Sequence, residues 1–303
     1  MFDIIVIGGT NIDIKAKTTA SHVRETSNPG VITFTPGGVA RNISHNLGSL
    51  GVKVALISAI GNDAPGQMAV NVTQSAGVDL SMCLLGDAPT GAYVAVLDET
   101  GELVSAVNDM RILNSLKSGY VKLHSAALQK AKFIIVDCNV RSDLLEFLAL
   151  HYSEKLIVEP VSVQKSQKLR TLLDKHEVFI ATPNRDQLKA LTDRADTDQA
   201  CQDLHERGLH NILVHLGPEG AILSSGKGMK QISCATHSQV SDVTGAGDAA
   251  VAGLVYGLSQ GYDISKSAHF GQAAASLVLS STSSTAIGLT AMALHNIYKA
   301  QYE

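Results

Sequence analysis

Short apolar runs alternate along much of the chain with stretches of helical periodicity. The runs are rich in β-branched residues, which is typical of strands buried on both faces of a parallel sheet. They occupy residues 3–7, 54–57, 133–136, 156–158, 178–181 and 212–214, and helical spacing is clearest over residues 142–150 and 197–206. This alternation predicts βαβ units in an α/β fold, with a mostly parallel central sheet flanked by helices.

Two regions depart from that pattern and predict a small separate sheet. Residues 93–97 and 102–107 flank Asp98-Glu99-Thr100-Gly101, a turn-rich linker suited to an antiparallel hairpin. Residues 31–35 also read as a strand of this kind. We expect a small antiparallel β lid, with strands contributed by about residues 14–35 and 92–107.

The last third of the chain predicts closing helices. From Asp248 onward the residues are mostly Ala, Leu and Ser with few helix breakers, which favours helices near residues 249–258, 265–279 and 289–298. The segment 280–285 consists only of Ser and Thr. It is too short for a disordered linker, and we expect a loop dense in hydroxyls and backbone carbonyls.

The composition of the chain indicates how it folds and limits the kinds of partner that we expect. The 303 residues are 45% hydrophobic, which is enough to bury a sizeable core without disulfides or metal. A net charge of −4 does not fit a protein that binds nucleic acid through its phosphates. Four widely spaced cysteines indicate reduced thiols in a cytoplasmic protein. No uninterrupted apolar stretch of about 18 residues is present, so we expect no membrane partner.

The strongest chemical signal is Ser241-Asp242-Val243-Thr244-Gly245-Ala246-Gly247-Asp248, directly before a predicted helix. Two glycines let the main chain fold around an anion, and the N–H groups at a helix start carry the positive end of the helix dipole. The segment therefore predicts an anion hole. Asp248 follows in the first helical turn and is a candidate base for an attacking hydroxyl. The alternative is that its carboxylate only complements the dipole.

Three competing motifs fit less well. Residues 245–250 satisfy G-x-G-x-x-A, but helix follows them where a dinucleotide fold needs a βαβ unit. Residues 257–261 satisfy G-x-S-x-G, but Ser259 ends a predicted helix instead of joining a strand to one. Gly226-Lys227 lacks the spacing and the Ser or Thr of a Walker A loop. If the protein uses ATP, it does so without a P-loop.

A second polar constellation lies near the N-terminus. Asn11 and Asp13 come directly after the first predicted strand, at its carboxyl end, where ligands bind in open α/β sheets. Gly37 and Gly38 precede a predicted helix that carries Asn42 in its first turn, and glycines there permit a polyol to approach the main chain. Each feature alone also fits an ordinary turn or helix entry.

Together these motifs resemble the ribokinase-like, or PfkB-type, carbohydrate and nucleoside kinases over essentially the whole chain. Residues 242–248 look like the C-terminal signature of that family, and Gly37-Gly38 with Asn42 look like its N-terminal one. Six segments resemble the members that phosphorylate pseudouridine, namely residues 27–30, 34–42, 108–110, 137–139, 160–162 and 183–185.

The resemblance implies a single ribokinase-like domain over residues 1–303, with a β lid through which two copies form a homodimer. It implies transfer of the γ-phosphate of ATP, with Mg²⁺, to the ribose 5′-hydroxyl of a nucleoside, pseudouridine being the favoured acceptor. Two alternatives stay open. One is a kinase for another sugar or nucleoside, such as ribose or adenosine. The other is a non-catalytic nucleotide- or sugar-binding regulator of the same fold.

The resemblance also assigns site residues. Asp248 matches the catalytic base. The positions that match the anion hole are Gly245, Ala246 and Gly247. The positions expected to hold the ribose are Asn11, Asp13, Gly37, Gly38 and Asn42. Those expected to bind the nucleotide are Asn184, Gly217, Thr244, Gly245 and Gly247. The polar groups that either read a uracil edge or are ordinary loop residues are Asn108, Asp109, Arg111 and Asn139.

Departures from the family pattern concern the metals. Asn184 begins the family's N-x-x-E element near magnesium and phosphate, but Gln187 replaces the Glu and cannot supply a carboxylate. Glu159 stands before Pro160 where the family more often has Asp. Asp242 and the 280–285 loop match the region where many members bind a monovalent cation, commonly potassium.

Overall fold

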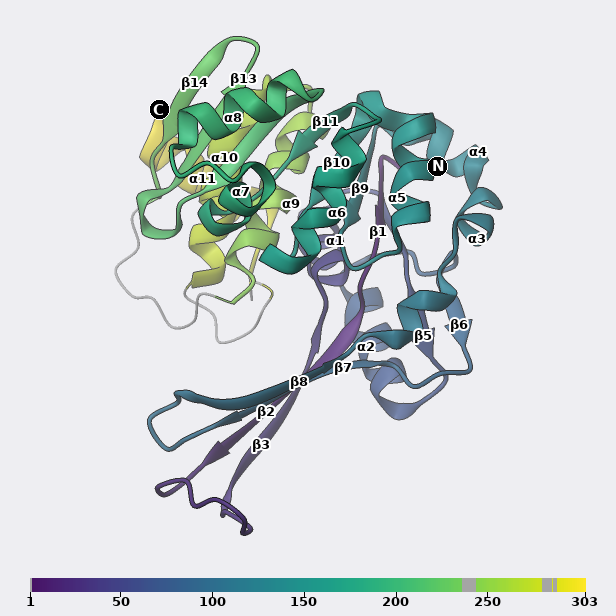
Figure 1. Ribbon diagram of the computed structural model, residues 1–303, viewed down its shortest axis with the longest axis vertical. Coiled ribbons are helices and arrows are strands. Elements are labelled where there is room, and N and C mark those ends of the chain that lie inside the picture. The colour runs from purple at the N-terminus through teal and green to yellow at the C-terminus, as the bar shows by residue number, and fades with distance from the viewer. Residues whose placement is uncertain (1, 236–243, 280–284, 286–287) are drawn as a thin grey trace.

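The main sheet forms the centre of the molecule (Figure 1), as seen in a computed structural model that describes residues 2–235, 244–279, 285 and 288–303. Within these residues its strand order is β14-β13-β12-β11-β10-β9-β1-β4. The strands are β1 (Ile4–Ile7), β4 (Val54–Ile57), β9 (Phe133–Asp137), β10 (Leu156–Glu159), β11 (Val178–Ala181), β12 (Leu209–His215), β13 (Ala221–Ser225) and β14 (Gly228–Ile232). All neighbours from β4 to β12 are parallel, while β13 and β14 add an antiparallel edge. The predicted α/β class is confirmed.

Helices cover both faces of this sheet. One face carries α1 (Val39–Ser49), α9 (Ala246–Ser259), α10 (Ile264–Leu279) and α11 (Ala291–Tyr302). The other carries α3 (Ser118–Lys122), α4 (Ser125–Lys130), α5 (Ser142–Tyr152), α6 (Val163–Leu173), α7 (Arg185–Thr192) and α8 (Thr197–Glu206). Because successive strand residues point to opposite faces, Ile4 and Val6 of β1 pack into one core, and Ile5 and Ile7 pack into the other. None of the helices in the described part of the chain is long and apolar enough to cross a bilayer.

A second sheet projects away from the main body (Figure 1) and forms the lid. Its strands, in the order β3-β2-β7-β8, are β2 (Asn11–Thr18), β3 (Gly30–Gly37), β7 (Gly91–Leu97) and β8 (Leu103–Asp109). The predicted β7–β8 hairpin is confirmed. Both outer pairs are antiparallel, but the central pair β2–β7 is parallel. The strand β2 also begins earlier than the expected residue 14, so that Asn11 and Asp13 belong to the lid.

Between the lid and the main sheet lie elements that the sequence pattern did not reveal. They are β5 (Ala59–Gly61), α2 (Ala64–Ser75) and β6 (Leu84–Gly86), and β5 pairs only with β6 among the described strands. Three short 3₁₀ turns complete the chain, namely Arg111–Ser115, Ser153–Lys155 and Gly217–Glu219.

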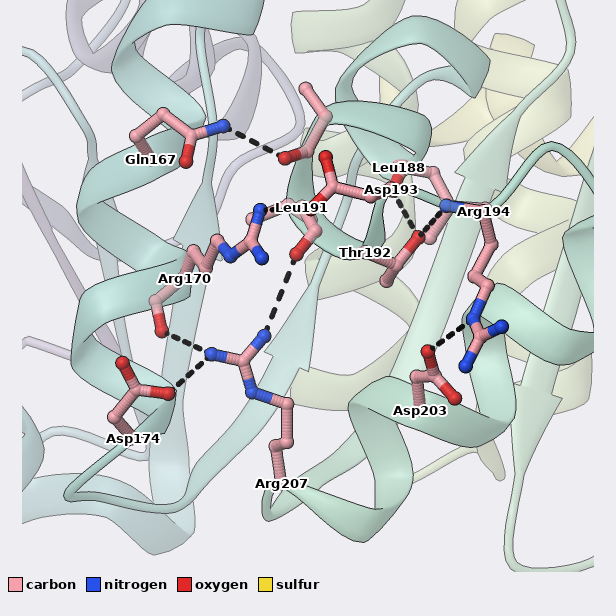
Figure 2. Close-up of polar contacts among 11 residues, drawn as sticks. Gln167, Arg170, Asp174, Leu188, Leu191, Thr192, Asp193, Arg194, Asp203 and Arg207 are labelled. Carbon is pink, nitrogen blue, oxygen red and sulfur yellow. Dashed lines mark hydrogen bonds and ion pairs between the residues drawn. The ribbon is translucent and has the colours of Figure 1, made fainter.

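A cluster of polar contacts joins α6, α7 and α8 (Figure 2). Arg207, just after α8, donates Nη2 to the carbonyl of Arg170 on α6 at 2.9 Å and forms an ion pair with Asp174. Gln167 donates to the carbonyl of Ala190 on α7 at 2.8 Å. These contacts join α6 to α7 and to the end of α8 on one face of the main sheet.

The start of α1 is fixed by a buried carboxylate. Asp137, at the end of β9, is fully buried and accepts hydrogen bonds from the N–H groups of Gly9 at 2.8 Å and Ala40 at 3.0 Å. Gly38 precedes the helix with φ of 97°, and a Cβ atom there would lie 2.4 Å from the carbonyl oxygen of Gly9. Only glycine therefore allows β1 and α1 to approach this closely.

We expect Gly38→Ala to destabilise the protein more than Gly51→Ala, its matched control at the other end of α1. Gly51 has a φ of 79° but open space around it, so an alanine there meets only the left-handed backbone penalty of about 1–2 kcal/mol. At Gly38 the clash is added, and we expect a total loss of at least about 2–3 kcal/mol. Thermal unfolding of both variants measures this. Equal losses would contradict the close approach.

Candidate active site

A cavity of about 820 Å³ opens at the carboxyl ends of β10, β11 and β12. This size is ordinary for a site that holds a small-molecule ligand or cofactor. Four of the five predicted nucleotide-binding residues line it, namely Asn184, Gly217, Gly245 and Gly247. The fifth, Thr244, is exposed directly before Gly245. The structure thus brings together segments that lie about 60 residues apart in the chain.

The start of α9 forms one wall of the cavity. Gly245 precedes the helix in the left-handed conformation, with φ of 83°, and the helix begins at Ala246. The residue at the N-cap position, Gly245, has no side chain that could cap the first N–H groups. Since Gly245, Ala246 and Gly247 all line the cavity, those N–H groups and the positive end of the helix dipole are available to an anion.

Asp248 stands in the first turn of α9, as predicted, and lines the same cavity. Its Oδ2 accepts a hydrogen bond of 2.7 Å from Nδ2 of Asn42 on α1. Burial raises the pKa of Asp248 to about 7, and the negative charges of Asp137 and Asp13 act in the same direction. The Asn42 hydrogen bond and the Arg41 charge oppose that rise. A carboxyl group that titrates near neutral pH is suited to accept a proton.

The acceptor side of the site is built at the root of the lid. Asn11 donates Nδ2 to Oδ1 of Asp13 at 2.7 Å. Gly37 of β3 is in register with Asn11, and a Cβ atom at Gly37 would lie 2.3 Å from Oδ2 of Asp13. Burial raises the pKa of Asp13. The hydrogen bond between Asn42 and Asp248 brings the two predicted motifs, from opposite ends of the chain, into contact.

Arg41 is a site residue that the candidate set omitted. Its side chain is 1% exposed, and its Nη2 donates to Oδ1 of Asn42 at 2.6 Å and to the carbonyl of Pro36. Burial lowers the pKa of Arg41 to about 10, while the charges of Asp248 and Asp13 raise it. By holding the amide oxygen of Asn42, Arg41 turns the amide nitrogen toward Asp248. The available signal was a basic residue inside the Gly-Gly helix entry.

The two asparagines expected near a base differ in position. Asn108 of β8 is in register with Tyr93 of β7, which is in register with Asp13 of β2, so the three side chains share one face of the lid. Asn139 lies at the carboxyl edge of the main sheet, where its Oδ1 accepts from Nζ of Lys165.

Their neighbours Asp109 and Arg111 bond mainly to each other, with Nη2 of Arg111 2.7 Å from Oδ2 of Asp109. The arginine side chain is 84% exposed. The structure therefore gives this pair a local contact at the lid base and no buried position in the site.

Gln187 has a structural role that explains the loss of the carboxylate. Its Oε1 accepts from the N–H of Asn184, and its own N–H donates to Oδ1 of Asn184, both at 2.9 Å. This reciprocal capping box starts α7, and a glutamine completes it as well as a glutamate does. The side-chain oxygen of Gln187 is thus directed to the main chain and not to a metal.

A magnesium ion bound mainly through nucleotide phosphates fits the remaining groups. Three carboxylates line the cavity, and Glu219 already pairs with Arg185 through both oxygens. Glu159 accepts from the N–H of Val161 at 2.7 Å, and burial together with the Asp248 charge raises its pKa well above the usual range. Mg²⁺ in kinases needs only one or two carboxylates besides phosphate and water. No cluster of three His, Cys, Asp or Glu side chains exists among the described residues.

The predicted monovalent-cation site falls mostly on residues that the structure does not describe. Asp242 and residues 280–284 lie outside the described residues, so the monovalent-cation prediction stays a prediction.

Thr182 and His215 line the cavity, and their Oγ1 and Nε2 atoms have no partner in the described part of the chain. Burial lowers the pKa of His215 to about 4, so the ring is neutral at physiological pH. Both follow apolar strands, where no sequence pattern distinguished them.

A cavity lined by a helix start and by Asp248, in a doubly covered sheet from which a second sheet projects, fits an enzyme that transfers a phosphoryl group to an alcohol. The family described as pfkB family carbohydrate kinase matches residues 1–291. The chain belongs to that family.

Individual proteins that are similar to this chain are also kinases. The chain is 36% identical over 284 residues to a pseudouridine kinase of Escherichia coli (strain K12), covering 91% of this chain and 90% of that relative. It is 33% identical over 278 residues to an uncharacterized sugar kinase of the same organism, covering 90% and 77%. The solved structure of a carbohydrate kinase from Agrobacterium tumefaciens is 28% identical with a TM-score of 0.85, covering 99% and 97%.

The titration of Asp248 predicts the pH dependence of turnover. A base must be deprotonated, so with a pKa of about 7 the value of kcat/KM for the acceptor should fall about tenfold between pH 8 and pH 6. Asn42→Ala removes a hydrogen bond to the charged form, which raises this pKa and moves the acid limb to higher pH. Asn46→Ala, one turn further along α1, should leave the limb in place. A limb that Asn42→Ala does not move would contradict this coupling.

Proposed function

We propose that this chain transfers the γ-phosphate of ATP to the ribose 5′-hydroxyl of pseudouridine. The observation that carries the proposal is the position of Asp248, which lines the cavity in the first turn of α9 and accepts a hydrogen bond from Asn42 of the Gly37-Gly38 segment. The 36% identity to a pseudouridine kinase supports this acceptor.

In the proposed reaction the protein contributes mainly position and charge. Asp248 accepts the proton of the 5′-hydroxyl group. The hydroxyl oxygen attacks the γ-phosphorus of ATP, and the bond between the γ-phosphorus and ADP breaks. The N–H groups of residues 245–247 stabilise the charge on the transferred phosphoryl group. Asn11, Asp13 and Asn42 hold the ribose hydroxyls, with Gly37 and Gly38 giving the main-chain clearance. Asn184, Gly217 and Thr244 belong to the nucleotide side.

The metal requirement follows from the same groups. Kinases of this family use ATP and generally need Mg²⁺, which neutralises phosphate charge when bound. Glu159 is the carboxylate that would hold it here, since the Gln187 oxygen serves the helix cap. A potassium site near Asp242 and residues 280–285 is also part of the proposal, on the resemblance alone.

Recognition of the base is assigned to Asn108 and Asn139, which approach the site from the lid and from the main sheet. A site built on hydrogen bonds rejects an analogue that cannot make them. A second candidate function is phosphorylation of another sugar or nucleoside, which the 33% identity to a sugar kinase favours.

Asp248→Asn should lower turnover at least about a hundredfold without loss of folding, because the amide keeps the shape of the side chain but is no base. The measurement is ADP release from Mg-ATP with pseudouridine, uridine, adenosine, ribose and fructose 6-phosphate, with and without potassium. The matched control is Asp263→Asn at the start of α10, where an exposed carboxylate accepts from the N–H of Lys266 at 2.9 Å. We expect the control to stay within twofold of the native rate.

Two outcomes would count against these assignments. Near-normal turnover in the Asp248→Asn variant would remove the base. Faster turnover of ribose or fructose 6-phosphate than of any nucleoside would move the proposal to the second candidate.

We further propose that two copies pair through the apolar face of the lid. The strand registers align Phe34, Ile14, Val94 and Val107 across all four strands, on the face opposite to Asp13 and Asn108. Phe34 is 54% exposed and Val107 is 66% exposed. An apolar row of this kind on an open sheet favours burial against a second copy.

The double substitution Phe34→Ser with Val107→Ser should therefore shift the protein from dimer to monomer. Sedimentation velocity measures the change. Val31→Ser is the matched control, because Val31 is 59% exposed but points to the other face of β3. A native protein that sediments as a monomer would contradict the proposed pairing.

A further inference from the structure

The start of β7 is held by one carboxylate. Asp63 caps α2 by accepting from the N–H of Gly66 at 2.8 Å. The same carboxylate accepts from the N–H of Thr90 at 2.8 Å and from the hydroxyl of Thr90 at 2.5 Å. The Thr90 hydroxyl in turn accepts from the N–H of Gly61 at 3.0 Å. Four hydrogen bonds thus join β5, α2 and the residue that precedes β7.

This contact stands at the start of β7, a lid strand that does not continue from the main sheet. The strand β2 follows β1 of the main sheet, β3 leads directly into α1, and β8 leads into the 3₁₀ turn Arg111–Ser115, whose Ile112 and Leu113 are buried in the core. In contrast, β7 is reached from β6, which pairs with β5 and not with the main sheet in the described part of the chain. Besides its ladder with β2, the start of β7 is held to the main body through Thr90.

The position of β7 affects its neighbour β2, the strand that carries Asn11 and Asp13. Gly91 directly follows Thr90 and is in register with Asn11 of β2. A Cβ atom at Gly91 would lie 2.7 Å from Sδ of Met110 and 3.3 Å from Cβ of Asn11, so the main chain there is closely packed. The ladder continues from Asn11 to Asp13, which is in register with Tyr93. A slip of one residue would turn every side chain of the strand to the other face.

We propose that Asp63 is a positioning residue that fixes, through Thr90 and the start of β7, the strand carrying Asn11 and Asp13. The inference rests on the proposed function, since it takes these two side chains as the groups that bind the acceptor. Asp63 is not among the residues that line the cavity. Its hydrogen bonds from Thr90 and Gly66 outweigh the effect of burial and lower its pKa, so it is a carboxylate in the working pH range.

Asp63→Asn and Thr90→Val test the proposal together. The asparagine can still cap α2 but offers one acceptor oxygen in place of two, and the valine removes the hydroxyl while leaving the cap intact. We expect each variant to raise the KM for the nucleoside about tenfold, with the KM for Mg-ATP changed less than twofold. The effects should not add in the double variant, because both break the same contact.

Asp196→Asn is the matched control for helix capping. Asp196 is exposed and caps α8, which packs on one face of the main sheet, by accepting from the N–H of Gln199 at 2.9 Å. It should leave both KM values unchanged. If Asp63→Asn only lowered thermal stability, as Asp196→Asn would, and left the nucleoside KM unchanged, Asp63 would be a helix cap and nothing more.

Hydrogen exchange separates this inference from the proposed function. Amides of residues 91–97 and 11–18 should exchange faster in Asp63→Asn and Thr90→Val than in the native protein or the control, whether or not a nucleoside is the acceptor. If the native protein phosphorylates no nucleoside, the proposed function fails while faster exchange still supports the anchor. Unchanged exchange in both variants would overturn the anchor.

Discussion

The hydrogen bond from Asn42 to Asp248 is the contact on which the site depends. It joins two side chains that are 206 residues apart, one on α1 and one on α9. Each helix also begins with a glycine whose positive φ brings its first turn to the site. This bond joins the helix start that carries Asp248 to the helix that follows the Gly37-Gly38 turn. It also favours the charged form of Asp248, since it lowers the pKa that burial raises.

Arg41 and Asp137 hold Asn42 in position for its hydrogen bond to Asp248. Arg41 is fully buried, and it orients Asn42 by taking up the amide oxygen. Asp137 accepts from the N–H of Ala40 at the start of α1, two residues before Asn42, and from the N–H of Gly9 after β1. Buried charges are costly unless they are hydrogen-bonded. Their presence here indicates that the position of α1 is set by charge as well as by apolar packing.

The sequence could predict elements whose signal is local. The strands at 54–57 and 178–181 and the helix at 197–206 have the predicted bounds, because β-branched runs and helical spacing mark buried strands and amphipathic helices directly. The alternating residues of β2 carried a strand signal from Asn11 onward that the lid prediction did not use. The strand β14 lies at the sheet edge and is exposed at four of its five residues, and its neighbour β13 ends in two serines, so both leave a weaker apolar pattern.

The site residues also divide into those with a local sequence signal and those whose partners are distant in the chain. Asp248 and Gly38 could be predicted because a glycine-rich turn at a helix start is a local pattern. The roles of Arg41, Asp137 and Asp63 could not, since each depends on partners that only the fold brings near. Gln187 is the instructive case: the sequence indicated a missing carboxylate, but only the capping box explains why an amide is sufficient there.

The two sheets divide the chemistry between them. In the proposed function, the nucleotide lies at the carboxyl edge of the main sheet, which packs against a core on each face. The proposed acceptor-binding residues Asn11 and Asp13 lie on a strand of the projecting second sheet. Substitutions outside a packed core disturb that core least. On this proposal, a change of acceptor is therefore most easily made in the second sheet and its contacts, with the start of α9 and Asp248 unchanged.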